Sequence, residues 1–217
     1  YHEVKVTTTF NSTTDGTVVS GTGCNLWVDY IYLDTDERRR FAQVSHEYLI
    51  EQVQHQSVSA ASSAVQETLN FNHPVKEIIW AGSNVGESKG ATVSFATPLA
   101  ITAGSTWRLK LNGHDRFATR PLTYFTRCQV WQHHTGPGGM LPVTGGTYNI
   151  CNDSIAVYSF ALKPEEHQPS GTCNFSRIDN AQLINTGTAC AVGLNIYAVN
   201  YNVLRIMSGM GGLAYSN

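Results

Sequence analysis

The chain of 217 residues carries 14 Lys and Arg against 16 Asp and Glu, which gives a formal net charge of -2. This balance offers no basic surface for a nucleic-acid backbone, so a genome-binding role is disfavoured. The length suffices to bury a core without disulfides or metals. Ser, Thr, Asn and Gly recur between short apolar runs, a composition that indicates an all-β protein with many turns.

Two segments near the N-terminus have the pattern of strands. Residues 3–10 alternate between apolar and polar side chains, and residues 24–33 are rich in aromatic and β-branched types. A short helix should follow from Asp34 to about His46, because Asp34 can cap it and Glu37 lies three residues further on. The two strands have no obvious partners, so we expect them to finish a preceding domain. The chain does not begin with Met and has no signal-peptide pattern, and we expect a fragment or a processed product.

From residue 48 onward, β-type segments recur at intervals and predict a sandwich of two sheets. Trp107 and Leu109 alternate with Arg108 and Lys110, which indicates a sheet with one wet face. Residues 155–162 are apolar on both faces and should lie deep in the core, and a short helix is expected within residues 121–134. Periodicity alone does not distinguish a jelly roll from an immunoglobulin-like sandwich. The predicted strands are 48–57, 65–71, 75–81, 106–111, 154–162, 172–184, 194–206 and 213–215.

No motif for catalysis or metal binding stands out. His133 and His134 are adjacent, and neighbouring residues on a strand or a helix do not readily aim both rings at one ion, so a polar loop is expected there. A cupin-type metal site needs several converging His, whereas His114 has no second His two positions away. There is no Gly-x-Ser-x-Gly elbow and no phosphate-binding loop. We therefore expect no catalytic, cofactor-binding or metal residue, and no enzyme.

Other reactive or charged groups also have ordinary explanations. Residues 38–40 are three consecutive Arg beside Asp34, Asp36 and Glu37. This arrangement favours a local ion-pair network or an inter-domain contact over nucleic-acid contact. The cysteines are odd in number and contain no C-x-x-C pair, so buried free thiols are expected, with a disulfide as the alternative. They are Cys24, Cys128, Cys151, Cys173 and Cys190.

Two surface features carry weaker signals. Weak N-glycosylation sequons begin at Asn11, Asn152 and Asn174. Residues 162–171 form a polar turn in which Pro164 and Pro169 limit flexibility. Such a turn suits a surface that meets a neighbour in fixed geometry, although a merely solvated turn is an equally good explanation.

Six stretches, in order along the chain, are distinctive. They are LDTDERRRFAQ at 33–43, HEYLIEQ at 46–52, NHPVKE at 72–77, LNGHDRF at 111–117, YSFALKPEEHQPSG at 158–171 and YNVLRIMSGMGGLAYSN at 201–217. They resemble, very closely, the major capsid proteins of nucleocytoplasmic large DNA viruses, most of all the algal-virus and mimivirus-like branches. The resemblance runs from near Tyr1 to Asn217. Members of that family are typically about twice as long as this chain.

The resemblance implies a double jelly roll, of which residues 1–45 would be the closing strands of the first jelly roll plus a helical connector, and residues 46–217 the C-terminal jelly-roll domain. It implies a structural protein without cofactors that forms a homotrimer, a pseudo-hexagonal capsomer in an icosahedral shell. The partners would be other copies and minor capsid proteins. The shell would lie close to an internal membrane without spanning it, and the virion would be assembled in the host cytoplasm.

Loops 82–98 and 119–153 are our candidates for lateral contacts, since loops vary without disturbing a core. A glycan-binding β-sandwich and a cupin-like enzyme are the alternatives. A glycan array would distinguish the first, and a stoichiometric ion at His114 or His133 would support the second.

Overall fold

The structure, a computed structural model, describes residues 3–8, 25–59, 66–82, 106–136, 140–141, 150–151, 155–186 and 193–216. The chain splits into two compact units. One comprises Tyr1–Tyr48 and Val203–Ser216, and the other comprises Leu49–Asn202 with Asn217.

The first unit contains the predicted helix and a C-terminal hairpin. Helix α1 (Thr35–Gln43) begins after Asp34, whose carboxylate accepts a hydrogen bond from the Thr35 amide at 2.7 Å, so the predicted cap is present. The helix ends at Gln43 because Val44 is extended, three residues before the expected end. Strand β13 (Met210–Leu213) folds back on the end of β12 (Leu194–Met207). Ser208 and Gly209 both have positive φ, as a tight two-residue hairpin turn requires.

The two N-terminal strands predicted at residues 3–10 and 24–33 are not formed in the structure. The described parts of both segments, residues 3–8 and 25–33, are extended chain that pairs with no described strand. Their apolar side chains are open to solvent, with Trp27 and Tyr32 each 90% exposed. The alternation marks a surface that would suit a sheet, but a ladder needs a partner strand, and none of the described strands supplies one.

The larger sheet has six strands among the described residues. Its order is β1-β12-β3-β10, with β9 also paired to β3 and β13 to β12. Ala198 on β12 opposes Ile78 on β3, and Trp80 opposes Ile196 on one side and Ala156 on the other. The strands not yet bounded are β1 (His46–Val58), β3 (Pro74–Gly82), β9 (Ile155–Ser159) and β10 (Cys173–Asn174).

The second sheet has five strands in the described part of the chain, in the order β2-β11-β4-β5 with β6 paired to β4. Leu183 opposes Leu109 at its centre. A separate pair joins β7 (Met140–Leu141) to β8 (Ile150–Cys151). The five strands are β2 (Gln66–Thr68), β4 (Thr106–Leu111), β5 (His114–Asp115), β6 (Arg120–Pro121) and β11 (Ala181–Thr186).

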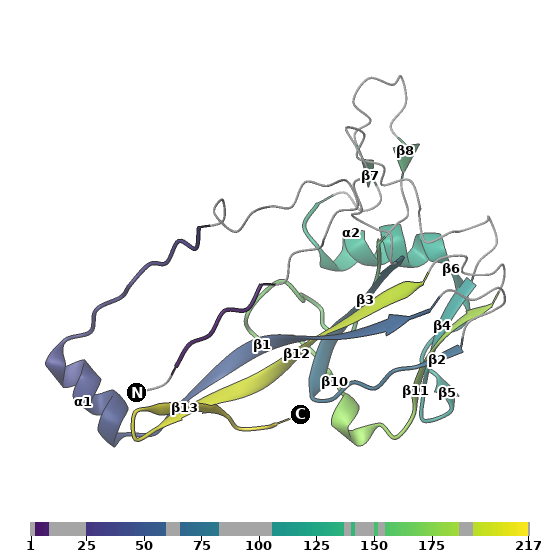
Figure 1. Cartoon of the computed structure of the whole chain (residues 1–217). Coiled ribbons are helices and arrows are strands. Elements are labelled where there is room, and N and C mark those ends of the chain that lie inside the picture. Colours follow the sequence, from purple (N-terminus) through teal and green to yellow (C-terminus); the bar gives the residue numbers. More distant parts are fainter. Residues whose placement is uncertain are drawn as a thin grey trace. The chain divides into compact units, whose positions relative to one another are not determined.

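The core lies between these two sheets, as the sequence predicted. Trp80 from the first sheet and Trp107 from the second are each 1% exposed, and their ring centroids are 5.6 Å apart. Phe125 closes the core from the π-helix η1 (Tyr124–Cys128), which continues as α2 (Gln129–His133) in the region where a helix was expected. Figure 1 shows α2 beside the long strands of the sandwich. The all-β, two-sheet expectation is therefore confirmed.

Four other predicted strands differ from the structure. The strand predicted at 65–71 is limited to β2 (Gln66–Thr68), and the strand predicted at 213–215 lies earlier, as β13 (Met210–Leu213). The predicted strand 172–184 is interrupted by a single turn of 3-10 helix, η2 (Phe175–Arg177), because the Asn174 side chain accepts a hydrogen bond from the Ser176 amide and caps that turn. Residues 155–162 are not buried throughout. Ile155 is 49% exposed and Leu162 is 74% exposed, since β9 ends at Ser159 and the chain turns outward.

Candidate assembly surface

The connection from Leu162 to Gly171 is held at both ends. The Lys163 amide donates to the Ser170 hydroxyl at 2.9 Å, and the Leu162 amide approaches the Ser170 carbonyl at 3.4 Å. Gly171 has a φ of 144°, and a Cβ there would lie 2.8 Å from the Phe160 carbonyl oxygen. Only glycine fits such a backbone comfortably. The connection is thus a fixed turn with exposed polar side chains, and we name it the 162–171 connection.

Helix α2 is fastened to β9 and to this connection. The Gln129 side chain accepts a hydrogen bond from the Ser159 amide at 3.2 Å. Nδ1 of His133 lies 3.1 Å from the Leu162 carbonyl oxygen. Thr135 donates to the Glu165 carboxylate from its amide at 3.0 Å and from its hydroxyl at 2.7 Å. These contacts fix the end of the helix against the turn.

His134 lies between two carboxylates from different parts of the unit. Its Nε2 is 2.9 Å from Oε2 of Glu77 on β3, and its Nδ1 is 3.1 Å from Oε1 of Glu165 in the connection. Glu77 is only 6% exposed. The Glu77 carboxylate has the largest effect on the imidazole and, helped by Glu165, raises its pKa above the usual value despite partial burial. Hydrogen bonds from Thr135, and then His134, lower the pKa of Glu165.

A second charged contact lies at the neighbouring position on β3. Lys76 is 3% exposed, and its Nζ lies 2.8 Å from Oε1 of Glu51 on β1 and 5.5 Å from the centre of the Tyr201 ring. Nδ1 of His167, in the 162–171 connection, is 3.8 Å from the same Glu51 oxygen. Burial raises the pKa of Tyr201. The lysine charge is thus balanced by a carboxylate and an aromatic face.

Glutamine side chains on β1 take the place of a missing strand ladder. The Gln54 amide group donates to the Asn72 carbonyl at 2.6 Å and accepts from the Asn72 amide at 2.9 Å. Gln56, two residues further along β1, also bonds to backbone groups. It donates to the Thr68 carbonyl at 2.8 Å and accepts from the Asn70 amide at 3.0 Å. These bonds tie the irregular backbone at residues 68–72 to an otherwise polar strand.

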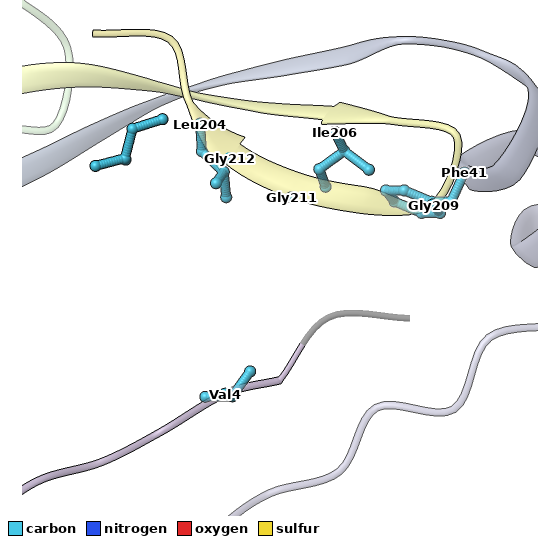
Figure 2. Close-up of a pocket in the computed structure, with 8 residues that line it drawn as sticks. Val4, Phe41, Leu204, Ile206, Gly209, Gly211 and Gly212 are labelled. Carbon is cyan, nitrogen blue, oxygen red and sulfur yellow. The ribbon is translucent and has the colours of Figure 1, made fainter. Parts of the chain in front are cut away.

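The first unit has an apolar groove of about 570 Å³. Phe41, Leu204 and Ile206 line it, and Figure 2 shows the glycines of the β12–β13 hairpin beside them. Because Gly211 and Gly212 have no side chains, the hairpin leaves this space open. The remaining lining residues are Val4, Gly209 and Leu213.

The histidines and asparagines singled out in the sequence form no common site among the described residues. His133 and His134 have different partners, and His114 lies exposed on β5. Asn174 is exposed and caps η2, whereas Asn11 and Asn152 lie outside the described residues. Within the described ranges, no three His, Cys, Asp or Glu side chains are grouped to hold a metal ion.

The described cysteine side chains are free thiols, as expected, but Cys128 is exposed and the expectation of burial is wrong for it. Cys128 and Cys173 are free, and burial raises the pKa of the half-buried Cys173. The side chains of the other three cysteines lie outside what the structure describes. Arg39 pairs with Asp36 at 3.3 Å, as a local ion pair. In the part of the chain that is described, no helix has the length and apolar character needed to cross a bilayer.

Known proteins are similar to this chain over its whole length. A family model described as the large eukaryotic DNA virus major capsid protein matches residues 37–212. The chain belongs to this family. The major capsid protein of Pyramimonas orientalis virus is 50% identical over 230 residues, which cover 100% of this chain and 56% of the relative. That of Paramecium bursaria Chlorella virus 1 is 41% identical, covering 100% of this chain and 61% of the relative.

A solved viral capsid contains a subunit whose structure is similar to that of this chain. The quasi-atomic model of the PBCV-1 virus capsid matches with a TM-score of 0.66 and 39% identity, over 87% of this chain and 56% of that one. The predicted fold class, a capsid-type jelly-roll sandwich, is confirmed. The chain spans less than two thirds of the length of these capsid relatives.

Sequence reasoning missed the most connected polar residues of this capsid-family chain. His134 was expected to lie in a polar loop, and nothing singled out its partners Glu77 and Glu165. The one available signal was Lys76-Glu77 inside an otherwise apolar run, since charges within a buried strand need partners. Which partners they take depends on a sheet register and a loop path that sequence spacing does not determine.

Proposed function

We propose that this chain is the C-terminal jelly roll of a viral major capsid protein whose work is to hold shape and bury surface. The observation that carries the proposal is the 50% identity over the entire chain to a major capsid protein, together with a sandwich whose exposed connection is fixed at both ends. Residues 1–45 would close a first jelly roll and connect it to residues 46–217. The open aromatic side chains at residues 25–33 support this, because they match a sheet surface that needs covering.

Three such chains would form a homotrimer. Two similar sandwiches in each of three chains give six similar blocks, and these allow near-hexagonal packing with closed threefold symmetry. The capsomers would tile an icosahedral shell together with minor capsid proteins, close to an internal membrane but without spanning it. This role needs no activated group, nucleic acid or cofactor, and so it is not enzymatic. The virion is the proposed location, with assembly in the host cytoplasm.

Lateral contacts would use the excursion between residues 119 and 153. Trp131 supports this assignment, because it is 79% exposed on α2 although α2 itself is fastened to the sandwich. A large aromatic side chain on a fixed element is well suited to anchor an interface with another copy. Residues 83–98 of the other candidate loop, 82–98, lie outside the described residues.

Sedimentation and light scattering of the protein encoded by the complete reading frame test the proposal. We expect a mass three times that of one chain, and ordered arrays at high concentration. Trp131→Ser should weaken array formation while leaving the trimer intact, whereas Val53→Ser, at a site on β1 that is 64% exposed, should change neither. A monomer at every concentration would contradict the capsomer proposal. Equal effects of the two substitutions would contradict the role given to Trp131.

A further inference from the structure

The surroundings of His134 are unfavourable for a neutral imidazole ring. A neutral ring carries one N–H and one lone pair. If Nδ1 donates its hydrogen to Glu165 at 3.1 Å, the lone pair of Nε2 faces the Glu77 carboxylate at 2.9 Å. Nε2 of His134 and Oε2 of Glu77 are both buried, and neither atom has a partner with hydrogen-bond geometry. Protonation of Nε2 replaces this repulsion with an ion pair inside a medium of low dielectric constant.

We propose that His134 is a proton-dependent clamp, which in its charged form fastens the end of α2 to β3 and to the 162–171 connection and in its neutral form releases them. Glu77 supplies the buried anchor, and Glu165 supplies the contact with the connection. Once the proton is lost, the buried Glu77 charge has no cation beside it. Separation of the ring from that carboxylate is then favoured. The Thr135–Glu165 bonds and the His133–Leu162 contact then remain between the helix end and the connection.

The other charged groups of the elements around His134 are directed elsewhere. On β3, Lys76 pairs with Glu51. In the connection, Lys163 pairs with Glu166 at 3.0 Å, and Nδ1 of His167 lies 3.8 Å from Glu51. His133, on the same helix end, contacts the Leu162 carbonyl oxygen. β9 contributes the uncharged Ser159, whose amide is bound to Gln129. His134 is therefore the cation shared by two carboxylates, Glu77 and Glu165.

The direction of the pH dependence follows from these pairs. The pKa of His134 is raised above 6.5, so its stabilising effect is complete below pH 6.5 and is lost as pH rises through the raised value. The pKa of Glu165 is lowered below 4.5, so its contribution is present above pH 4.5 and is lost as pH falls through the lowered value. The clamp is closed between these limits and opens on the alkaline side. This behaviour belongs to the Leu49–Asn202 unit and does not depend on the proposed assembly.

Histidine-ring NMR titration and amide hydrogen exchange of the chain from pH 5.5 to 8.5 test the proposal. The His134 ring should titrate above 6.5 and carry both ring protons in the acidic range. After correction for intrinsic exchange, peptides covering 129–136 and 162–171 should exchange faster at pH 8.5 than at pH 5.5, because the raised pKa of His134 places the loss of its charge within this range. Thr135 reports directly, because its amide is bound to Glu165.

Three variants make the result decisive. Glu165→Gln, at a side chain that is 41% exposed, should fold and should lower the pKa of His134. His134→Gln should make the exchange of the Thr135 amide independent of pH, and His133→Gln should leave its pH dependence as it is. A flat exchange profile in the unmodified chain, or titration of His134 at or below 6.5, would overturn the clamp. So would a Glu165→Gln variant in which the His134 titration does not move.

Discussion

Trp107→Ala removes the largest side chain that the five-stranded sheet contributes to the core. Trp107 is 1% exposed and contacts Trp80 across the sandwich, with 5.6 Å between ring centroids. An aromatic side chain of this size buries up to about 250 Å², which at about 25 cal/mol per Å² corresponds to about 6 kcal/mol as an upper limit. Partial collapse of the cavity reduces this, and truncations of this kind cost about 3–5 kcal/mol. We expect a loss of about 4 kcal/mol in the free energy of unfolding.

The chain supplies a matched control for this substitution. Trp131 is 79% exposed, and Trp131→Ala should change the free energy of unfolding by no more than about 0.5 kcal/mol. Urea titrations followed by far-UV circular dichroism measure both variants without relying on tryptophan fluorescence. Trp107→Phe should cost less than Trp107→Ala, because it keeps most of the ring and removes an indole N–H that is buried without a partner. Equal losses for Trp107→Ala and Trp131→Ala would refute the placement of the core.

Three further substitutions test separate parts of the fold by the same urea titration. Phe160 is only partly buried at the edge of the core, so Phe160→Ala should reduce the free energy of unfolding by about 2 kcal/mol, less than truncation of a fully buried ring. A loss equal to that of Trp107→Ala would be inconsistent with this position. Gly171→Ala should cost about 1–3 kcal/mol, because its φ is 144° and the new Cβ would meet the Phe160 carbonyl; an unchanged midpoint would argue against that backbone. Gln54→Ala should cost about 1–2 kcal/mol and speed exchange of the Asn72 amide, and full protection of that amide would show that the glutamine is not its partner.

The sequence predicted the sandwich well where side chains alternate over a strand with two neighbours. Thr106–Leu111 was predicted without error as β4, because Trp107 and Leu109 alternate with Arg108 and Lys110, and the structure buries the first pair at 1% exposure. The helix start at Asp34 was predicted for an equally local reason, since a cap depends on residues within one turn.

Prediction failed where the outcome depends on distant partners. Residues 3–10 alternate as a strand does and residues 24–33 have the composition of one, but the described parts of both segments pair with no described strand. The break at Phe175 follows from the Asn174 side chain, which competes with the ladder for a backbone amide. The grouping of Glu77, His134 and Glu165 joins β3, a helix end and a loop, and no spacing rule brings those three positions together.

Cryo-electron microscopy of the protein encoded by the complete reading frame, assembled at high concentration, tests the central claim most directly. We expect threefold capsomers in which the Leu49–Asn202 sandwich, with its paired Trp80 and Trp107, fits one of two similar blocks per subunit. Particles without threefold symmetry, or density for residues 49–202 that holds a helical fold in place of two facing sheets, would contradict it.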